Sequence, residues 1–123
     1  MTIFDSPPRQ PCVTLIGMAG AGKSTVGRLV AAGLGFAHLD TDDLICAAYA
    51  RPLQETYEYL GRERFLAAEE ELVAGLDVAR SVISTGGSVV YGPRAMARLK
   101  GLGPLVHLHA DLDSVASRVA QNP

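Results

Sequence analysis

A glycine-rich segment near the start of the chain has the residue types and spacing of a phosphate-binding loop. Residues 17–24 match the pattern G-x-x-x-x-G-K-[ST] at every fixed position. In such a loop the glycines let backbone amides converge on phosphate oxygens, and the following helix points its positive end the same way. Lys23 supplies a cation for the outer phosphates, and Ser24 offers Mg²⁺ a hydroxyl ligand. The residues expected to contact the nucleotide are Gly17, Gly20, Ala21, Gly22, Lys23, Ser24 and Thr25.

Two further segments place reactive or permissive residues after short apolar runs. Residues 40–43 read Asp-Thr-Asp-Asp, and residues 84–88 read Ser-Thr-Gly-Gly-Ser. Ligands of parallel α/β sheets bind at the carboxyl ends of the strands, so both segments should lie beside the phosphate loop. One carboxylate can order Mg²⁺ and another can accept the proton of an attacking hydroxyl, while the glycine turn lets backbone amides approach a substrate. The acids also suit a helix start, and capping is compatible with catalysis.

The use made of the nucleotide is a separate question, because GTPases, ATPases and small kinases share this loop. The chain contains no Asn-Lys-x-Asp segment of the kind that reads guanine, which argues against a GTPase. Residues 105–111 resemble the apolar strand followed by an aspartate that large ATPases have, but two histidines interrupt the apolar run. Neither of these two classes is favoured.

The elements that must hold these segments alternate between strand and helix. Short apolar, β-branched runs predict strands, and apolar residues at helical spacing predict helices between them. This alternation predicts a parallel sheet covered by helices on both faces, a three-layer α/β/α fold. The expected strands are 12–16, 36–40, 81–84 and 105–109, and the expected helices are 23–34, 42–49, 53–60, 62–76, 93–100 and 111–120.

Length and composition indicate one soluble domain. The chain has 123 residues, which suits a single core, and prolines in residues 1–11 predict a flexible lead before a domain at 12–123. Its net charge is -2 with acids and bases mixed, so no nucleic-acid partner is expected. No apolar stretch is long enough for a membrane, and two cysteines without metal or redox spacing suit the cytoplasm. We expect a cytoplasmic monomer whose carboxyl-terminal part, with a further strand, is missing.

The order of these motifs resembles the shikimate kinase family of the nucleoside-monophosphate-kinase-like fold. The resemblance rests on the phosphate loop, Asp-Thr-Asp at 40–42 and Thr-Gly-Gly at 85–87, with Gly61, Phe65 and Glu69 between them. It implies transfer of the ATP γ-phosphoryl group to a hydroxyl of a small substrate, with Mg²⁺ as the metal. The positions that carry family roles are Asp40 for the metal, Asp42 for the substrate hydroxyl and as candidate base, Gly86 and Gly87 for the substrate, and Arg118 against the adenine.

The chain departs from the family pattern on the substrate side. Leu66 follows Phe65 where the family has an arginine that grips the substrate carboxylate, and Ser88 takes the place of a third glycine. The chain also ends before the family's lid arginine. Loss of a charge-assisted fork costs about 1.5–3 kcal/mol, or roughly ten- to a hundredfold in affinity. Because the resemblance is broad, shikimate is still the first acceptor to consider. These departures make another small alcohol such as homoserine the second, and a nucleotide-binding module without kinase activity is the rival from another class.

Two remaining groups have plainer interpretations. Glu69, Glu70 and Glu71 predict a solvated helix face. His107 and His109 lie on one side of a predicted strand, but no third ligand accompanies them, so ordinary structural histidines are expected rather than a metal pair.

Overall fold

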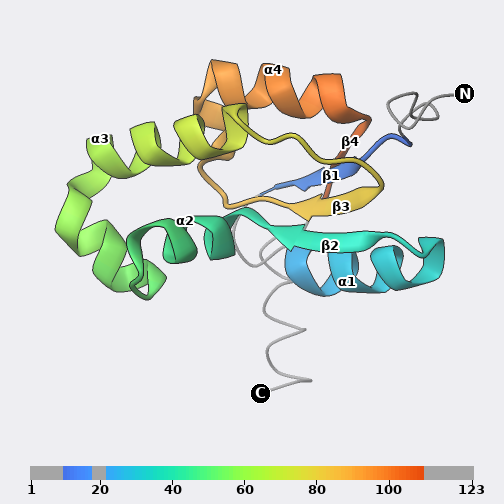
Figure 1. The fold of residues 1–123 in the computed structure, drawn as a ribbon, viewed down its shortest axis with the longest axis horizontal. Coiled ribbons are helices and arrows are strands. Elements are labelled where there is room, and N and C mark those ends of the chain that lie inside the picture. Colours follow the sequence, from blue (N-terminus) through green and yellow to red (C-terminus); the bar gives the residue numbers. More distant parts are fainter. Residues whose placement is uncertain (1–9, 18–21, 110–123) are drawn as a thin grey trace, which may run out of the picture.

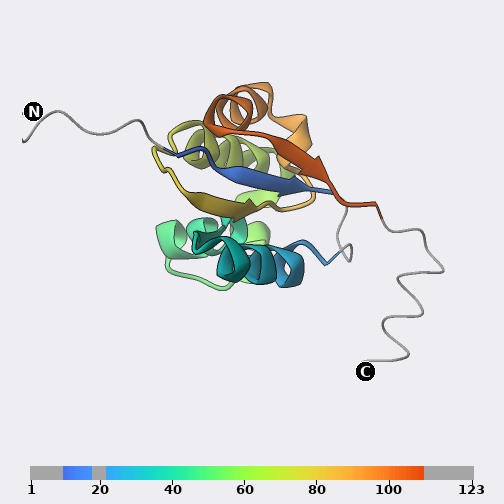
Figure 2. The same cartoon turned by 90° about the vertical axis from the view of Figure 1, so that its right-hand side faces the viewer.

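Four parallel strands form the centre of the fold. The computed structural model describes residues 10–17 and 22–109, and in these residues the sheet has the strand order β2-β3-β1-β4. Helices cover both faces, with α3 and α4 on one side and α1 on the other, while α2 continues from the end of β2 and packs against α3 (Figures 1 and 2). The elements are β1 Val13–Ile16, α1 Lys23–Leu34, β2 Ala37–Asp40, α2 Thr41–Tyr49, α3 Leu53–Ala74, β3 Ser81–Ser84, the 3₁₀ turn η1 Val89–Tyr91, α4 Pro93–Leu102 and β4 Leu105–His107. The predicted three-layer α/β/α fold is confirmed.

Each face of the sheet packs its own apolar cluster, as alternating side chains of a doubly covered strand require. On β3, Val82 faces α1 and packs with Leu15 and Ala31, whereas Ile83 faces the opposite side. The cluster on that side takes its buried members from α3, η1, α4 and the segments beside them: Cys12, Val73, Leu76, Val89, Ala95 and Leu99. The two clusters fix the sheet between the helix layers.

The first helix begins and ends where the sequence predicts. It runs from Lys23 to Leu34 and stops at Gly35, whose left-handed φ of 70° suits glycine. The Gly35 amide donates to the carbonyls of Ala31 and Ala32, which closes the last turn. The predicted helix boundaries are confirmed here because both end signals are local.

The third helix is broken at Gly61, as the prediction of two helices at 53–60 and 62–76 requires. Gly61 has φ 76° and ψ 169°, which no right-handed helical residue adopts. The second half ends at Ala74, before Gly75, so the predicted end at 76 is two residues too long.

Other boundaries differ modestly from the predictions. The last described strand ends at His107, not at 109, and β1 and β2 each begin one residue later than predicted. Helix α2 begins at Thr41, one residue early, and α4 continues to Leu102. The predicted helix at 111–120 lies outside the described residues.

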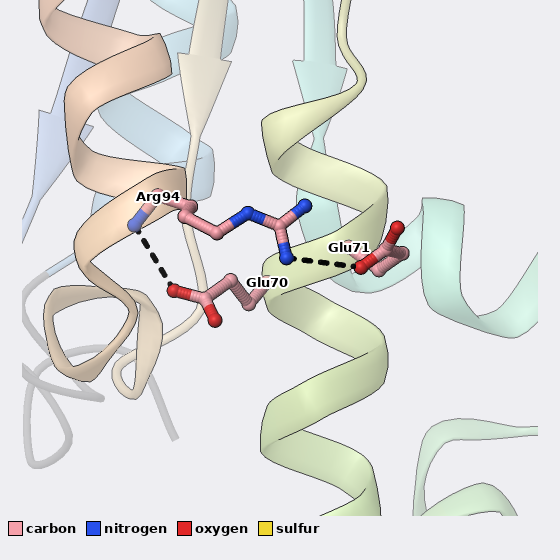
Figure 3. Close-up of polar contacts among 3 residues, drawn as sticks. All are labelled: Glu70, Glu71 and Arg94. Carbon is pink, nitrogen blue, oxygen red and sulfur yellow. Dashed lines mark hydrogen bonds and ion pairs between the residues drawn. The ribbon is translucent and has the colours of Figure 1, made fainter.

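A pair of glutamates on α3 holds the start of α4 (Figure 3). The Arg94 backbone amide donates to Glu70 Oε2 at 3.0 Å, and the Arg94 guanidinium bonds Glu71 Oε2 at 3.2 Å. Because Pro93 at the first helical position has no N–H, Glu70 satisfies the first free donor of α4 from a neighbouring helix. Glu70 therefore acts as a cap supplied by another element.

Candidate active site

The carboxyl ends of β1, β2 and β3 meet at one hollow. Its lining comes from the phosphate loop, the start of α2 and the turn after β3: Gly22, Lys23, Ser24, Thr25, Asp42, Thr85, Gly86 and Gly87. The three motifs that the sequence singled out are thus brought together, as expected for parallel strands. Gly20, Ala21 and Arg118 lie outside the described residues.

Lys23 is almost buried at the base of this hollow, with 8% of its surface exposed. Its Nζ donates to the Gly17 carbonyl of its own loop. Burial lowers the pKa of Lys23, and the nearby charges of Asp42 and Asp40 oppose that shift. A cation held in low dielectric at the base of this hollow suits an anionic phosphate ligand.

Ser24 and Asp40 are in direct contact. The Ser24 hydroxyl donates to Asp40 Oδ2 at 2.6 Å, while Asp40 Oδ1 accepts from the Asp42 amide at 2.9 Å and caps α2. The hydroxyl and the carboxylate together form a hard-oxygen pair of the type that Mg²⁺ binds while keeping several waters. Within the described residues no cluster of three or more His, Cys, Asp or Glu forms a metal cage. The donor set therefore fits an ion completed by phosphate and water.

Asp42 stands between two adjacent hollows. It lines the phosphate hollow and also a second one, which we call the acceptor pocket, lined by Asp42, Leu53, Gln54, Tyr57, Phe65, Gly86, Gly87 and Ser88. Burial foremost and then the charge of Asp40 raise the pKa of Asp42, while Lys23 lowers it. A carboxyl with a raised pKa at the junction of two pockets suits proton transfer.

The acceptor pocket has aromatic walls, and the described residues that line it include no lysine or arginine. Tyr57 and Phe65 meet edge to face with ring centroids 5.3 Å apart. Leu66 lines a neighbouring cavity with Glu69 and Ser88 instead. Arg64 turns back to donate to the carbonyls of Leu60 and Tyr59, so it does not replace a pocket cation.

The two glycines of the turn after β3 differ. The Gly86 amide donates to Thr41 Oγ1 at 3.0 Å and is therefore engaged within the protein. Gly86 lines the acceptor pocket, and its contact with a substrate stays a prediction. Gly86 matters for its missing side chain: a Cβ there would lie 2.7 Å from Asp42 Oδ1. Gly87 is exposed to solvent.

A buried hydrogen-bond chain, which no sequence pattern predicted, supports the phosphate loop from below. Ser84 Oγ donates to the Lys23 carbonyl at 2.9 Å and lies 2.8 Å from His38 Nε2. Because the single hydroxyl proton goes to Lys23, His38 Nε2 is the donor to Ser84. Gly27 makes room for the chain, since a Cβ there would lie 2.2 Å from Ser84 Oγ. The chain links β2 and β3 to the first residue of α1.

Glu69 contradicts the expectation of a solvated acidic face. Its side chain is 2% exposed and accepts from Ser88 Oγ at 2.9 Å, whereas Glu71 is exposed. The spacing of Phe65, Glu69 and Val73 at four-residue intervals puts them on one buried stripe, and this signal could have identified Glu69.

The two histidines remain apart from any metal cluster. The rings of His107 and His109 have centroids 4.1 Å apart, and His107 ends β4. Among the described residues no group of three metal-ligating side chains includes them, and their interpretation as ordinary structural histidines stays a prediction.

Comparison with known proteins agrees with this geometry. The family model "Shikimate kinase" matches residues 19–123. The shikimate kinase of Enterococcus faecalis is 33% identical over 89% of this chain and 66% of its own length, and that of Geobacter sulfurreducens is 39% identical over 87% and 60%. The structure of shikimate kinase from Acinetobacter baumannii in complex with shikimate superposes with a TM-score of 0.82 at 29% identity, over 92% of this chain and 64% of that one.

This chain spans about 60–66% of the length of these relatives. The family match nevertheless covers most of the chain and includes the second half of the phosphate loop, the acidic segment and the glycine turn. The chain therefore belongs to the shikimate kinase family.

Proposed function

We propose that the protein is a magnesium-dependent kinase that transfers the γ-phosphoryl group of ATP to a hydroxyl of a small metabolite, with shikimate as the first acceptor. The observation that carries this proposal is the position of Asp42, which lines both the phosphate hollow and the acceptor pocket. A group at that junction can touch an acceptor hydroxyl and lie near the phosphoryl group that it attacks. We further propose that the protein acts as a cytoplasmic monomer. Among the described residues, no helix has the length and apolarity that membrane crossing requires.

Each side chain has a distinct part in this proposal. Lys23 neutralises charge on the transferred phosphoryl group, and Ser24 and Asp40 hold the metal. Mg²⁺ bound there would add positive charge beside the phosphates. Asp42 orients the acceptor hydroxyl and takes its proton. Most of the rate enhancement then comes from positioning and charge neutralisation.

Different observations support shikimate and another acceptor. Membership in the family and the likeness to a protein solved with shikimate support shikimate. The described residues of the acceptor pocket and the neighbouring Leu66 supply no cation for a carboxylate, which weakens the case for any acceptor that carries one, shikimate and homoserine alike. Another small alcohol is therefore the second candidate, and homoserine is one example because it is small and has a primary hydroxyl.

A nucleotide-binding module without catalysis is the rival from another class. Release of ADP by the complete gene product, supplied with Mg-ATP and with shikimate or homoserine in parallel, separates the possibilities. We expect acceptor-dependent release with shikimate. Release with homoserine alone would keep the kinase chemistry and change the substrate. Nucleotide binding without release for either acceptor would contradict the proposal and favour the module.

A further inference from the structure

A hydrogen-bond chain from β2 and β3 ends on the first residue of the helix that follows the phosphate loop. Ser84 Oγ donates to the Lys23 carbonyl at 2.9 Å, and His38 Nε2 lies 2.8 Å from the same serine oxygen. Ser84 is only 1% exposed, so water cannot easily replace its hydroxyl if the hydroxyl is removed. The bond therefore ties the sheet to the start of α1 across 61 residues of sequence.

This tie acts on the residues proposed to bind the nucleotide. Lys23 is held through its backbone, while its side chain lines the phosphate hollow. The next residue, Ser24, is held separately, because its hydroxyl donates to Asp40 Oδ2. His38 and Asp40 are two residues apart on β2, so their side chains project from the same face of that strand. One strand face thus supports the first turn of α1 at two points, directly through Asp40 and indirectly through Ser84.

Helix α1 packs against this chain too closely for a side chain at Gly27. A Cβ at Gly27 would overlap with Ser84 Oγ and would lie 2.8 Å from His38 Nε2. Gly27 lies about one helical turn after Lys23, which places it over the same part of the sheet. The missing side chain therefore lets the start of the helix come within hydrogen-bonding distance of Ser84.

We propose that His38 and Ser84 are positioning residues for nucleotide binding. They hold the Lys23 backbone so that its ammonium group and the amides of the first turn of α1 face the phosphates before the nucleotide arrives, and a preformed site loses less conformational entropy on binding. Neither residue is among the described residues that line the phosphate hollow. The inference rests on the nucleotide-binding part of the proposed function and assigns part of the affinity to residues outside the hollow.

The tie through Ser84 is independent of the proposed metal site. Ser24 and Asp40 are the proposed metal ligands, so their mutual hydrogen bond competes with metal binding. The bond between Ser84 and the Lys23 carbonyl involves no proposed metal ligand. The effect of Ser84 on nucleotide affinity should therefore appear both with and without Mg²⁺.

Calorimetric titration of the complete gene product with ADP, in the presence and in the absence of Mg²⁺, tests this role. Ser84→Ala should raise the Kd for ADP about three- to tenfold in both conditions. Ser81→Ala is the matched control, because Ser81 is also buried on β3 and its hydroxyl donates to the Ala79 carbonyl at 3.0 Å, at the other end of the strand. It should lower the melting temperature but leave the Kd for ADP within about twofold of wild type.

Variants of His38 test whether this residue acts through Ser84. His38→Leu should raise the Kd for ADP about two- to fivefold, and His38→Gln, whose side-chain amide keeps an N–H donor, should bring it back near the wild-type value. In the double variant Ser84→Ala/His38→Leu the Kd should rise little beyond that of Ser84→Ala alone. Gly27→Ala should also weaken ADP binding, whereas Gly33→Ala on the same helix should not, because a Cβ at Gly33 meets nothing within 4 Å.

The outcomes separate the positioning role from the kinase proposal. An unchanged Kd for ADP in Ser84→Ala, even with a lower melting temperature, would overturn the positioning role, and so would an equal rise in Ser81→Ala. Additive effects in the double variant would overturn the action of His38 through Ser84. A wild-type protein that binds ADP normally but shows no acceptor-dependent ADP release would contradict the kinase proposal alone, because the positioning role requires only nucleotide binding.

Discussion

The Ser24 hydroxyl donates a 2.6 Å hydrogen bond to Asp40 Oδ2, which joins the first turn of α1 to the residue that ends β2. Asp40 uses its other oxygen to cap α2. The Asp40 carboxylate thus binds the Ser24 hydroxyl, a proposed metal ligand, and also fixes the start of the helix that carries Asp42. Metal binding and helix position are coupled through a single side chain.

Two substitutions at Asp40 separate these roles. Asp40→Asn keeps a side-chain oxygen for the cap but removes the charge, so the Mg²⁺ concentration for half-maximal activity should rise about 10- to 100-fold with little change in stability. Asp40→Ala should add a loss of about 1 kcal/mol in the free energy of unfolding. Magnesium titrations of ADP release and urea unfolding measure the two effects. Equal magnesium requirements in wild type and Asp40→Asn would contradict the metal role.

Asp42→Asn should spare nucleotide affinity and lower kcat by about a hundredfold or more, because an amide cannot accept the hydroxyl proton. Calorimetry with Mg-ADP and a coupled assay of ADP release provide the comparison. Asp43→Asn is a suitable control, since Asp43 is exposed on the next position of the same helix. A parallel loss of nucleotide affinity in Asp42→Asn would indicate a structural role instead.

The raised pKa of Asp42 also predicts how stability depends on pH. In the folded protein this carboxyl keeps its proton to a higher pH than in the unfolded chain. The ionised carboxylate therefore lowers the stability of the folded state. The stability that the protonated Asp42 contributes is fully present below its ordinary pKa of 3.8. It is lost as the pH rises through the folded-state pKa. The melting temperature of Asp42→Asn minus that of wild type should increase with pH. A difference that is constant or falls between pH 4 and 8 would refute this.

Two buried threonines provide a matched pair for stability. Thr14 Oγ1 has no hydrogen-bond partner among the described residues, whereas Thr56 Oγ1 donates to the Pro52 carbonyl at 3.0 Å. Both residues are at most 1% exposed. Thr14→Val should therefore stabilise the protein by about 1 kcal/mol, and Thr56→Val should destabilise it by a similar amount. Chemical unfolding of both variants measures these changes. A change of the same sign in the free energy of unfolding of both variants would contradict the prediction.

Truncation of Glu70 and truncation of Glu71, which are neighbours on α3, should lower the stability of the protein by different amounts. Glu70 caps α4 through the Arg94 amide, so Glu70→Ala should cost about 0.5–2 kcal/mol of stability. Glu71 makes a solvent-exposed ion pair with the Arg94 side chain, and Glu71→Ala should cost less than about 1 kcal/mol and lose that effect in high salt. Thermal unfolding at low and high salt is the measurement. A larger loss in Glu71→Ala would mean that the cap contributes little.

Local signals explain what the sequence could predict. The phosphate loop, the helix from Lys23 to Gly35 and the break at Gly61 each depend on residues within a few positions, so the pattern contains them. The convergence of Asp42 with the turn at Gly86 followed from the rule for parallel strands.

Contacts between distant segments explain what the sequence could not predict. The bond between Ser88 and Glu69 needs the angle at which α3 crosses the turn after β3, and the chain from His38 through Ser84 needs the register of β2 with β3. The expectation that Glu69 is solvated was wrong because a run of three acids suggests an exposed face, although one helix position in the run points inward.

The strand order also governs how this chain can fold while it is being synthesised. Strand β1 pairs with β3 and β4 but not with its immediate successor β2, and β2 pairs with β3. Val13 meets Val82, which the ribosome adds much later, and β1 must wait unpaired during that interval. Such distant pairings slow folding and lengthen the exposure of strand edges. Strand β1, one of the two inner strands of the sheet, therefore has both of its edges unpaired in the nascent chain until Ser84 has emerged.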